Sequence, residues 1–371
     1  MPRRANTFRY IFLGLVTLAV LSMSHAQNTT MAPSHVKTTE EVYQNIKVLK
    51  GIPSDELIPG MQFITASLGV ECSFCHVENH FERDDKKPKE TARKMIRMVM
   101  ALNRDEAFGN TPKVTCNSCH RGSRLPVSIP AISEQPALPG AAEYLQLANL
   151  PAPDQVLSRY VQALGGANAI AALTTLAETG TTLVGNRETT LEIFDQSPDK
   201  RVMVIHLPTG ESVTAFNGAE GWTLAAHRPF REMPSADLPG EKMDADLQFA
   251  LKIKDLLGDL KSGPLEKVGG QDVYQLIAEK NGRPAARLYF SKESGLLVRA
   301  LRYAASPLGL NPTRIDYDDY RPLHGVKIPY RWTIARPFGQ LTVQVTKAEA
   351  NVPIDSRKFE KPLEAEQQSA K

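Results

Sequence analysis

The residues of this 371-residue chain most suited to chemistry are its cysteines, all of which belong to one short pattern. Cys-x-x-Cys-His occurs twice, as Cys72-Ser-Phe-Cys75-His76 and as Cys116-Asn-Ser-Cys119-His120. This pattern is the attachment signal of c-type haem. Two thiols one helical turn apart can each bond one porphyrin, and the adjacent imidazole can then turn onto the iron. The sequence therefore predicts two covalently bound haem c groups, attached through Cys72, Cys75, Cys116 and Cys119, with His76 and His120 as iron ligands.

Three other uses of four cysteines compete with this interpretation. Two disulfides are an option in an exported protein, and a thioredoxin-type redox pair would need only one of the two motifs. A zinc ribbon usually places its Cys-x-x-Cys pairs about 15 to 20 residues apart, whereas 40 residues lie between Cys75 and Cys116. Only 8 residues of the chain are His, so a His directly after both pairs favours haem.

Methionines on two expected helices are candidates for the second axial position of each iron. A short helix is expected from Gly60 to Leu68 with Gly69 as its stop, and a longer one from about Lys89 to Asn103. Met61 lies on the first helix, and the apolar face of the second is expected to hold Met95, Met98, Val99 and Leu102. Met is also a common core residue, so core packing is the alternative. A His/Met-ligated iron has both axial positions filled, which favours electron transfer over catalysis.

The N-terminus has the pattern of a secretory signal peptide. Arg3, Arg4 and Arg9 precede an apolar run from Tyr10 to Met23, and Ser24-His25-Ala26 offers a cleavage site. The run is short for a bilayer of about 30 Å, so we expect residues 1–26 to be removed. Haem attachment after export then predicts a periplasmic protein, with inner-membrane association as the alternative. The formal charge of +3 comes from these three arginines, which leaves no charge signature of a nucleic-acid-binding protein.

Two expectations concern the residues around the haem motifs. Thr38-Thr-Glu-Glu41 fits a capping box opening a helix that contains Ile46 and Leu49 and ends at Gly51. Several arginines and a lysine near the motifs are candidates for contacting haem propionates, with a solvated helix face as the alternative. They are Arg93, Lys94, Arg97, Arg121 and Arg124.

The rest of the chain predicts a linker and a second domain. Six prolines fall between Pro126 and Pro153, which indicates a linker over about 125–153. An interrupted helix is expected from Asp154 to Leu173, and another from Asp237 to Leu260. Period-two runs predict strands, with hairpin turns at Asn217-Gly218 and Asn281-Gly282. The expected strands include 181–184, 189–194, 201–206, 273–277, 286–290 and 296–303.

The haem-motif region resembles the cytochrome subunit of the photosynthetic reaction centre, which usually carries four c-type haems. The resemblance covers about residues 42–122 and rests on MQFITASLGVECSFCH, TARKMIRMVMALN and VTCNSCHRG. It implies Met61 as the axial ligand of the first haem and Met95 as that of the second, with Met98 and Met100 as alternatives. Only two of the four haem motifs are present, so the chain resembles one half of the family's repeated body. A redox partner is implied: a membrane reaction centre in photosynthesis, or another cytochrome.

The C-terminal part is similar to the LolA-like lipoprotein-carrier half-barrel in its strand order and in its closing segments, VKIPYRWTI and VTKAEANVPIDSRKFEKP. That resemblance implies an apolar cavity suited to a quinone or a lipid tail, with a packed structural domain as the alternative. The expected fold class is thus multidomain α+β, an all-α dihaem cytochrome c domain (27–124) followed by an antiparallel β half-barrel domain with covering helices (154–371).

These features together predict a periplasmic dihaem electron carrier rather than an enzyme. A dihaem peroxidase-like enzyme is the first alternative, because one iron with an open distal site would allow catalysis. A binding module that reports a lipid or quinone through its redox state is the second. No Walker A loop, G-x-S-x-G elbow or H-E-x-x-H motif occurs in the chain.

Overall fold

The computed structural model of the protein describes residues 36–106, 114–126, 150–184, 187–225, 230–280, 283–337 and 339–362. The expected signal peptide (1–26) and most of the expected linker (125–153) lie outside these residues. Among the helices of the described residues, none is both long enough and apolar enough to cross a membrane.

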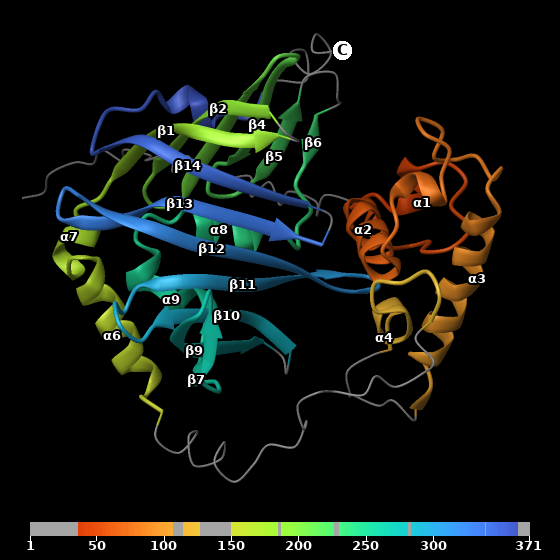
Figure 1. The fold of residues 1–371 in the computed structure, drawn as a ribbon. Coiled ribbons are helices and arrows are strands. Elements are labelled where there is room, and N and C mark those ends of the chain that lie inside the picture. The colour runs from red at the N-terminus through yellow and green to blue at the C-terminus, as the bar shows by residue number, and fades with distance from the viewer. Residues whose placement is uncertain are drawn as a thin grey trace, which may run out of the picture. The chain divides into compact units, whose positions relative to one another are not determined.

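The haem-motif region is built from helices in its described part (Figure 1). Its α-helices are α1 (Thr39–Val42), α2 (Leu57–Leu68), α3 (Lys87–Leu102) and α4 (Cys116–His120), and its 3-10 helices are η1 (Ser54–Glu56) and η2 (Cys72–Phe74). Helix α2 ends as expected, because Gly69 adopts the left-handed conformation at φ 64° and donates its N–H to Thr65.

The C-terminal part forms one antiparallel sheet, which confirms the expected strands and their covering helices. Its strands follow the order β6-β5-β4-β3-β2-β1-β14-β13-β12-β11-β10-β9-β7, and β8 pairs with β9. Nearly every strand lies beside its neighbour in the chain, and β14 pairs with β1. The strands are β1 (Thr175–Val184), β2 (Arg187–Gln196), β3 (Lys200–Leu207), β4 (Gly210–Phe216), β5 (Gly221–Ala225), β6 (Arg231–Glu232), β7 (Leu260–Ser262), β8 (Glu266–Val268), β9 (Gln271–Lys280), β10 (Arg283–Ser291), β11 (Leu297–Ser306), β12 (Gly309–Leu323), β13 (Val326–Arg336) and β14 (Gly339–Ala350).

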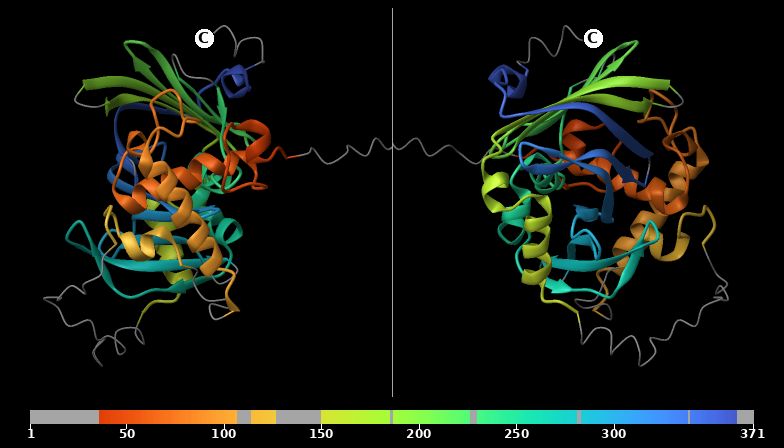
Figure 2. Two further views of the ribbon diagram at one scale, coloured as in Figure 1. Left: turned by 90° about the vertical axis from the view of Figure 1, so that its right-hand side faces the viewer. Right: turned by 60° about the vertical axis from the view of Figure 1, so that its left-hand side comes forward.

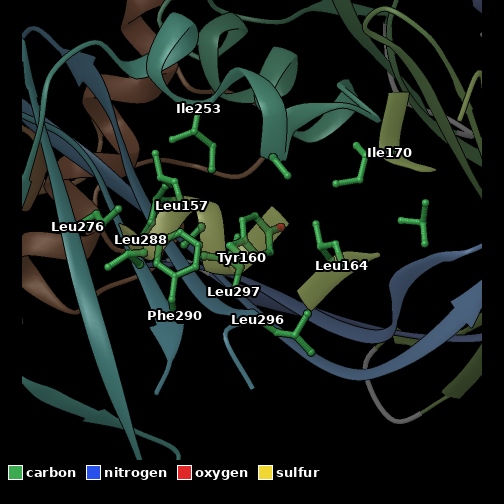
Figure 3. Packing of buried hydrophobic residues seen from close by; sticks show 14 of the residues in the cluster. Leu157, Tyr160, Leu164, Ile170, Ile253, Leu276, Leu288, Phe290, Leu296 and Leu297 are labelled. Carbon is green, nitrogen blue, oxygen red and sulfur yellow. The ribbon is translucent and has the colours of Figure 1, made fainter. Parts of the chain in front are cut away.

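Four helices pack against one face of this sheet. They are α6 (Pro153–Leu164), α7 (Ala167–Ala171), α8 (Leu238–Ala245) and α9 (Phe249–Leu257). In Figure 1, α8 and α9 lie behind the strands, and the turned views of Figure 2 show that the strands do not lie in one plane. The main core lies between these helices and the sheet, where Leu157 and Tyr160 of α6 pack with Ile253 of α9 and Phe290 of β10 (Figure 3). Its burial is the main stabilising contribution of this region.

Two expectations about the helices are wrong. The helix expected from Asp237 to Leu260 is two helices, because Asp246 adopts an extended conformation between them. Its carboxylate accepts the N–H of Gln248 at 2.9 Å and so forms a turn directly before α9. The expected first helix is also too long. Its capping box forms, but α1 ends at Val42, and the chain turns at Asn45 with φ 59°.

The expected interruption of the first helix and the expected turn at Asn217-Gly218 are confirmed. Helix α6 ends at Leu164 with Gly165 as its C-cap, and α7 begins at Ala167. Asn217 and Gly218 form the turn between β4 and β5, where Asn217 Oδ1 accepts the backbone N–H groups of Ala219 and Glu220. Residues 281 and 282 lie outside the described residues, but β9 and β10 on either side of them pair as a hairpin.

Candidate haem sites

Each Cys-x-x-Cys-His motif forms a short helical turn that places its histidine beside its first cysteine. In the first motif, the N–H groups of Cys75 and His76 both bond the carbonyl of Cys72, at 3.2 and 3.0 Å. The second motif is helix α4, capped by Thr115, whose N–H bonds Ser118 Oγ at 3.0 Å. The thiols of one motif are thus one turn apart, as attachment to one porphyrin requires.

Both histidines hold their rings in the same way. Nδ1 of His76 lies 3.0 Å from the carbonyl oxygen of Phe81, and Nδ1 of His120 lies 2.9 Å from that of Ser123. A carbonyl oxygen can only accept, so Nδ1 carries the proton in each ring and Nε2 carries the lone pair. This is the arrangement that orients a metal-ligating histidine. Burial, aided by the positive charges of Lys89 and Arg93, lowers the pKa of His76 and favours its neutral form.

None of the four thiols forms a disulfide, and they differ in exposure: Cys72 and Cys119 are exposed, Cys75 is half-buried and Cys116 is buried. All four cysteines lie among the described residues and are free, which does not support the disulfide alternative. Burial raises the pKa of Cys75 and of Cys116. In the described part of the chain, no three His, Cys, Asp or Glu side chains converge as a metal site would require, so the zinc-ribbon alternative lacks a ligand cluster. The donor set of two thiols and one Nε2 per motif therefore fits a haem c.

The fold brings the two motifs together although 40 residues separate them in sequence. The N–H of Gly122, directly after the second motif, bonds the carbonyl of Ser67 near the end of α2 at 2.8 Å. The guanidinium of Arg124 lies 5.8 Å from the ring centre of Phe74, which stands between the cysteines of the first motif. Sequence reasoning missed this pairing, which only the packing of α2 on α4 reveals.

The four candidate methionines fall into two groups. Met61 of α2 and Met100 of α3 pack at the edge of a cluster of buried residues that includes Cys116. Met95 and Met98 point outward on α3 and are 40% and 45% exposed, with Leu102 on the same face. Val99 lies one turn from Met95, but it is buried, so of the four residues expected on this apolar face only Met95, Met98 and Leu102 are exposed. The exposed stripe is an apolar surface suited to a porphyrin face.

Arg93 does not extend into solvent as a free propionate contact. It is buried, and its guanidinium bonds Asp84 Oδ1 at 2.8 Å and the carbonyl of Asn45 at 3.3 Å. Asp84 also pairs with Lys47 at 2.6 Å. These partners, Arg93 first, hold the pKa of the Asp84 carboxyl well below its usual range. Arg93 thus ties α3 to the loop before it, while Lys94 and Arg97 remain on the exposed side of α3.

A buried lysine lies next to the first histidine and was not predicted from the sequence. Nζ of Lys89 donates to the carbonyl oxygen of Phe81 at 2.8 Å, the same oxygen that accepts from His76 Nδ1. It also bonds the carbonyl of Arg83 at 2.6 Å and Asp84 Oδ1 at 3.1 Å. Among the described residues, no ammonium group donates to the equivalent carbonyl of Ser123, so the two motifs differ in charge.

Comparison with known proteins shows which proteins this region is similar to. Residues 18–162 match the photosynthetic reaction centre cytochrome C subunit family. The resemblance seen in the sequence is confirmed by relatives of that family. The chain is 32% identical over 112 residues to the photosynthetic reaction center cytochrome c subunit of Thermochromatium tepidum, which covers 29% of this chain and 28% of that protein. It is 35% identical over 85 residues to cytochrome c-554 of Chloroflexus aurantiacus, over 21% and 20% of the two chains.

The reaction centre cytochrome match over residues 18–162 includes both haem motifs and ends before the first strand of the sheet. The chain covers less than a third of the length of these relatives. The sheet region is similar to a DUF1329 family protein from Desulfovibrio piger, at 14% identity and a TM-score of 0.39 over 57% of this chain and 98% of that one. A LolA superfamily protein from Nitrosomonas europaea gives 11% identity and a TM-score of 0.37 over 57% and 99%. The region related to c-type cytochromes is therefore joined to a large antiparallel sheet.

Proposed function

We propose that this protein is a periplasmic electron carrier with two covalent haem c groups and no catalytic role. The observation that supports this most directly is the shared arrangement of the motifs, in which each histidine commits Nδ1 to a carbonyl and leaves Nε2 for iron. When bound, haem c supplies one-electron chemistry between ferric and ferrous iron. Cys72 and Cys75 would tether the first group, and Cys116 and Cys119 the second.

The residues around the motifs have defined roles in this proposal. His76 and His120 would each bind one haem iron, and Met61 and Met95 would be the second protein ligands, with Met98 and Met100 as alternatives to Met95. The contacts of Gly122 with Ser67 and of Arg124 with Phe74 keep the motifs adjacent. Adjacent redox groups can exchange electrons within one chain before either meets a partner. The partner would be a membrane reaction centre or another cytochrome.

Haem stoichiometry is the first test. The full chain, expressed with its N-terminus and with haem-attachment machinery, should reach the periplasm and carry two covalent haems, measured as haem per polypeptide and by intact mass. The double variants C72A/C75A and C116A/C119A serve as matched controls, because each should retain one haem. A haem-free, zinc-loaded or disulfide-only product would overturn the proposal.

Carbon monoxide and peroxide distinguish the carrier from a dihaem peroxidase-like enzyme. With both axial positions filled by protein ligands, the reduced protein should not bind carbon monoxide, and the oxidised protein should not turn over peroxide. A high-spin haem that reacts with peroxide would favour the enzyme.

A second function is proposed for the sheet region, which we infer holds an apolar ligand such as a quinone or a lipid tail in a half-barrel. This is supported by a cavity of about 560 Å³ between the sheet and its covering helices. Ligand sites commonly have volumes of roughly 300 to 1,000 Å³ and mostly apolar walls. Saturable binding of a fluorescent lipid by the full chain would support this function, and its absence would count against it.

A further inference from the structure

The cavity between the sheet and its helices has one apolar part and one polar part. Apolar side chains of the main core line the first part, among them Leu164 of α6, Ile170 of α7 and Leu297 of β11 (Figure 3). The polar part is formed by three neighbouring strands, which contribute Glu178 from β1, Asp195 from β2 and Arg201 from β3. Such a site suits a molecule with an apolar body and a polar group at one end.

Strand register places the three polar side chains on one face of the sheet. Glu178 is opposite Ile193, two residues from Asp195 on β2, and Asp195 is opposite Arg201. Residues two apart on a strand point to the same side. Arg201 Nη1 bonds both oxygens of Asp195, at 3.0 and 3.1 Å, and the carbonyl of Asp244 at 3.2 Å.

The two arginines that line the cavity are already balanced by carboxylates, and the third basic residue of the lining, Lys327, is exposed. Arg201 is paired with Asp195, whose side chain is 1% exposed, and Arg336 lies 3.6 Å from Glu241. An anionic ligand would compete with these carboxylates for the two arginines. The site is therefore poorly suited to a carboxylate or phosphate.

Glu178 differs from its neighbours because its carboxyl has no hydrogen-bond partner among the described residues, although the positive charge of Arg201 acts on it. It lines the cavity and is 5% exposed, yet no described group hydrogen-bonds to it. Burial, with the nearby Asp195 charge, raises the pKa of Glu178 to about 8. The carboxyl is then protonated at neutral pH and carries one O–H donor. A buried donor without an acceptor is costly, and an acceptor on a ligand would relieve that cost.

We propose that this cavity binds an apolar molecule bearing an uncharged carbonyl group, whose oxygen accepts the hydrogen bond of Glu178. The apolar body lies against Leu164, Ile170 and Leu297. This inference rests on the proposed apolar-ligand function and adds the class of the ligand. Quinones and esterified lipids share this chemistry, and the experiment distinguishes the two sources.

The charged groups facing Glu178 come from the neighbouring strands. They are Asp195 on β2 and Arg201 on β3, with Asp244 of α8 bonded to Arg201 through its carbonyl. Ionisation of Glu178 beside Asp195 replaces the donor with an acceptor and adds like charge. Carbonyl binding should therefore weaken as the pH rises from 6.5 to 9.

Calorimetric titration of the full-length, haem-loaded chain tests the proposal with three probes: decylubiquinone, methyl laurate and laurate. Methyl laurate and laurate share an acyl chain and differ in the charge of the head. We expect methyl laurate, decylubiquinone or both to bind at pH 6.5, and laurate to bind at least tenfold more weakly than methyl laurate. Binding of one carbonyl probe alone would identify the source as ester or quinone.

Variants separate the hydrogen bond from the cavity. Glu178→Leu should weaken carbonyl binding about tenfold, while Glu178→Gln keeps an N–H donor and should bind at pH 9 as it does at pH 6.5. Glu188→Gln, an exposed glutamate on β2, is the matched control and should change nothing. If the Leu variant fails to fold, the pH dependence of carbonyl binding by the natural chain and by the Gln variant shows whether Glu178 is the donor. If the carbonyl probes bind equally well at both pH values and to both Glu178 variants, Glu178 is not the hydrogen-bond donor. The apolar-ligand function would then still hold. Absence of binding by every probe would overturn both.

Discussion

Lys89 and His76 donate to one oxygen, because Nζ of Lys89 lies 2.8 Å and Nδ1 of His76 lies 3.0 Å from the carbonyl of Phe81. An ammonium group at that oxygen weakens its pull on the imidazole proton. With the proposed haems bound, the imidazole would donate less charge to iron, and the nearby positive charge would also favour the ferrous state. Both effects would raise the potential of the first haem relative to the second.

Replacing Lys89 should therefore lower one potential only. Lys89→Gln is expected to change the reduction equilibrium of the first haem about tenfold, or about 59 mV for a one-electron couple. Spectroscopic redox titration measures this. Lys89→Arg keeps the charge and should restore most of the potential, and the exposed Lys94→Gln on the same helix is the control. Equal shifts at both haems, or none, would contradict the assignment.

Axial ligation by methionine predicts changes confined to one haem at a time. Met61→Ala and Met95→Ala should each leave one low-spin haem intact and lower the potential of the other, because loss of a thioether ligand opens the iron and destabilises its ferrous state. Absorption and magnetic spectroscopy of the oxidised protein would detect the new high-spin haem. Leu102→Ala is the matched control, since Leu102 lies on the same exposed face of α3 as Met95 and has no sulfur, and Met98→Ala tests the alternative ligand on that face. If Met100→Ala produces the change instead, the ligand comes from the buried side of α3.

The contact between α2 and the segment after the second motif predicts that Gly69 cannot be replaced without loss of stability. Gly69 has φ +64°, and a Cβ there would run into the carbonyl oxygen of Gly122. Gly69→Ala combines left-handed strain with displacement of backbone, so we expect a loss of about 2 kcal/mol in the free energy of unfolding. Gly51→Ala is the matched control, because Gly51 has φ +74° with no atom within 4 Å of a built Cβ. Denaturant unfolding should show the larger loss at Gly69, and equal losses would mean that the α2 contact is loose.

Burial of Glu178 predicts a decrease of stability with rising pH. Its pKa in the folded chain, about 8, lies above its ordinary value of 4.5. The folded chain therefore holds a proton that the unfolded chain loses, and this contribution is fully present below pH 4.5 and is lost as the pH rises through 8. Asp195, raised to about 6 by burial, acts in the same direction at lower pH.

The measurement compares the natural chain with Glu178→Gln at pH 6 and pH 8. At about 1.4 kcal/mol per pK unit, the natural chain should lose about 2 kcal/mol more stability between these two pH values than the variant. Glu188→Gln should follow the natural chain. A natural chain whose stability declines no more than that of the Gln variant would mean that Glu178 ionises normally.

Local patterns determined much of this protein. The haem motifs are readable because attachment depends on spacing within five residues, and a histidine after each cysteine pair distinguishes them from disulfides. Helix α2 and its Gly69 stop, the break at Gly165 and the alternating strands also follow from near neighbours. Where a local signal was misread, as at Asp246, a turn closed by the aspartate side chain interrupted the apolar period.

Only the tertiary structure decided which of these local pieces meet. The pairing of the two motifs depends on α2 packing against α4, and the carbonyl shared by Lys89 and His76 depends on a loop folding back onto α3. The sequence left open whether Met95 faces a core or a cofactor, because both produce the same apolar stripe along a helix. Glu178, Asp195 and Arg201 stand on three successive strands, and only the strand register places their side chains on one face of the sheet. Such contacts depend on how separate segments of the chain pack together, and the spacing of residues within one segment does not reveal that.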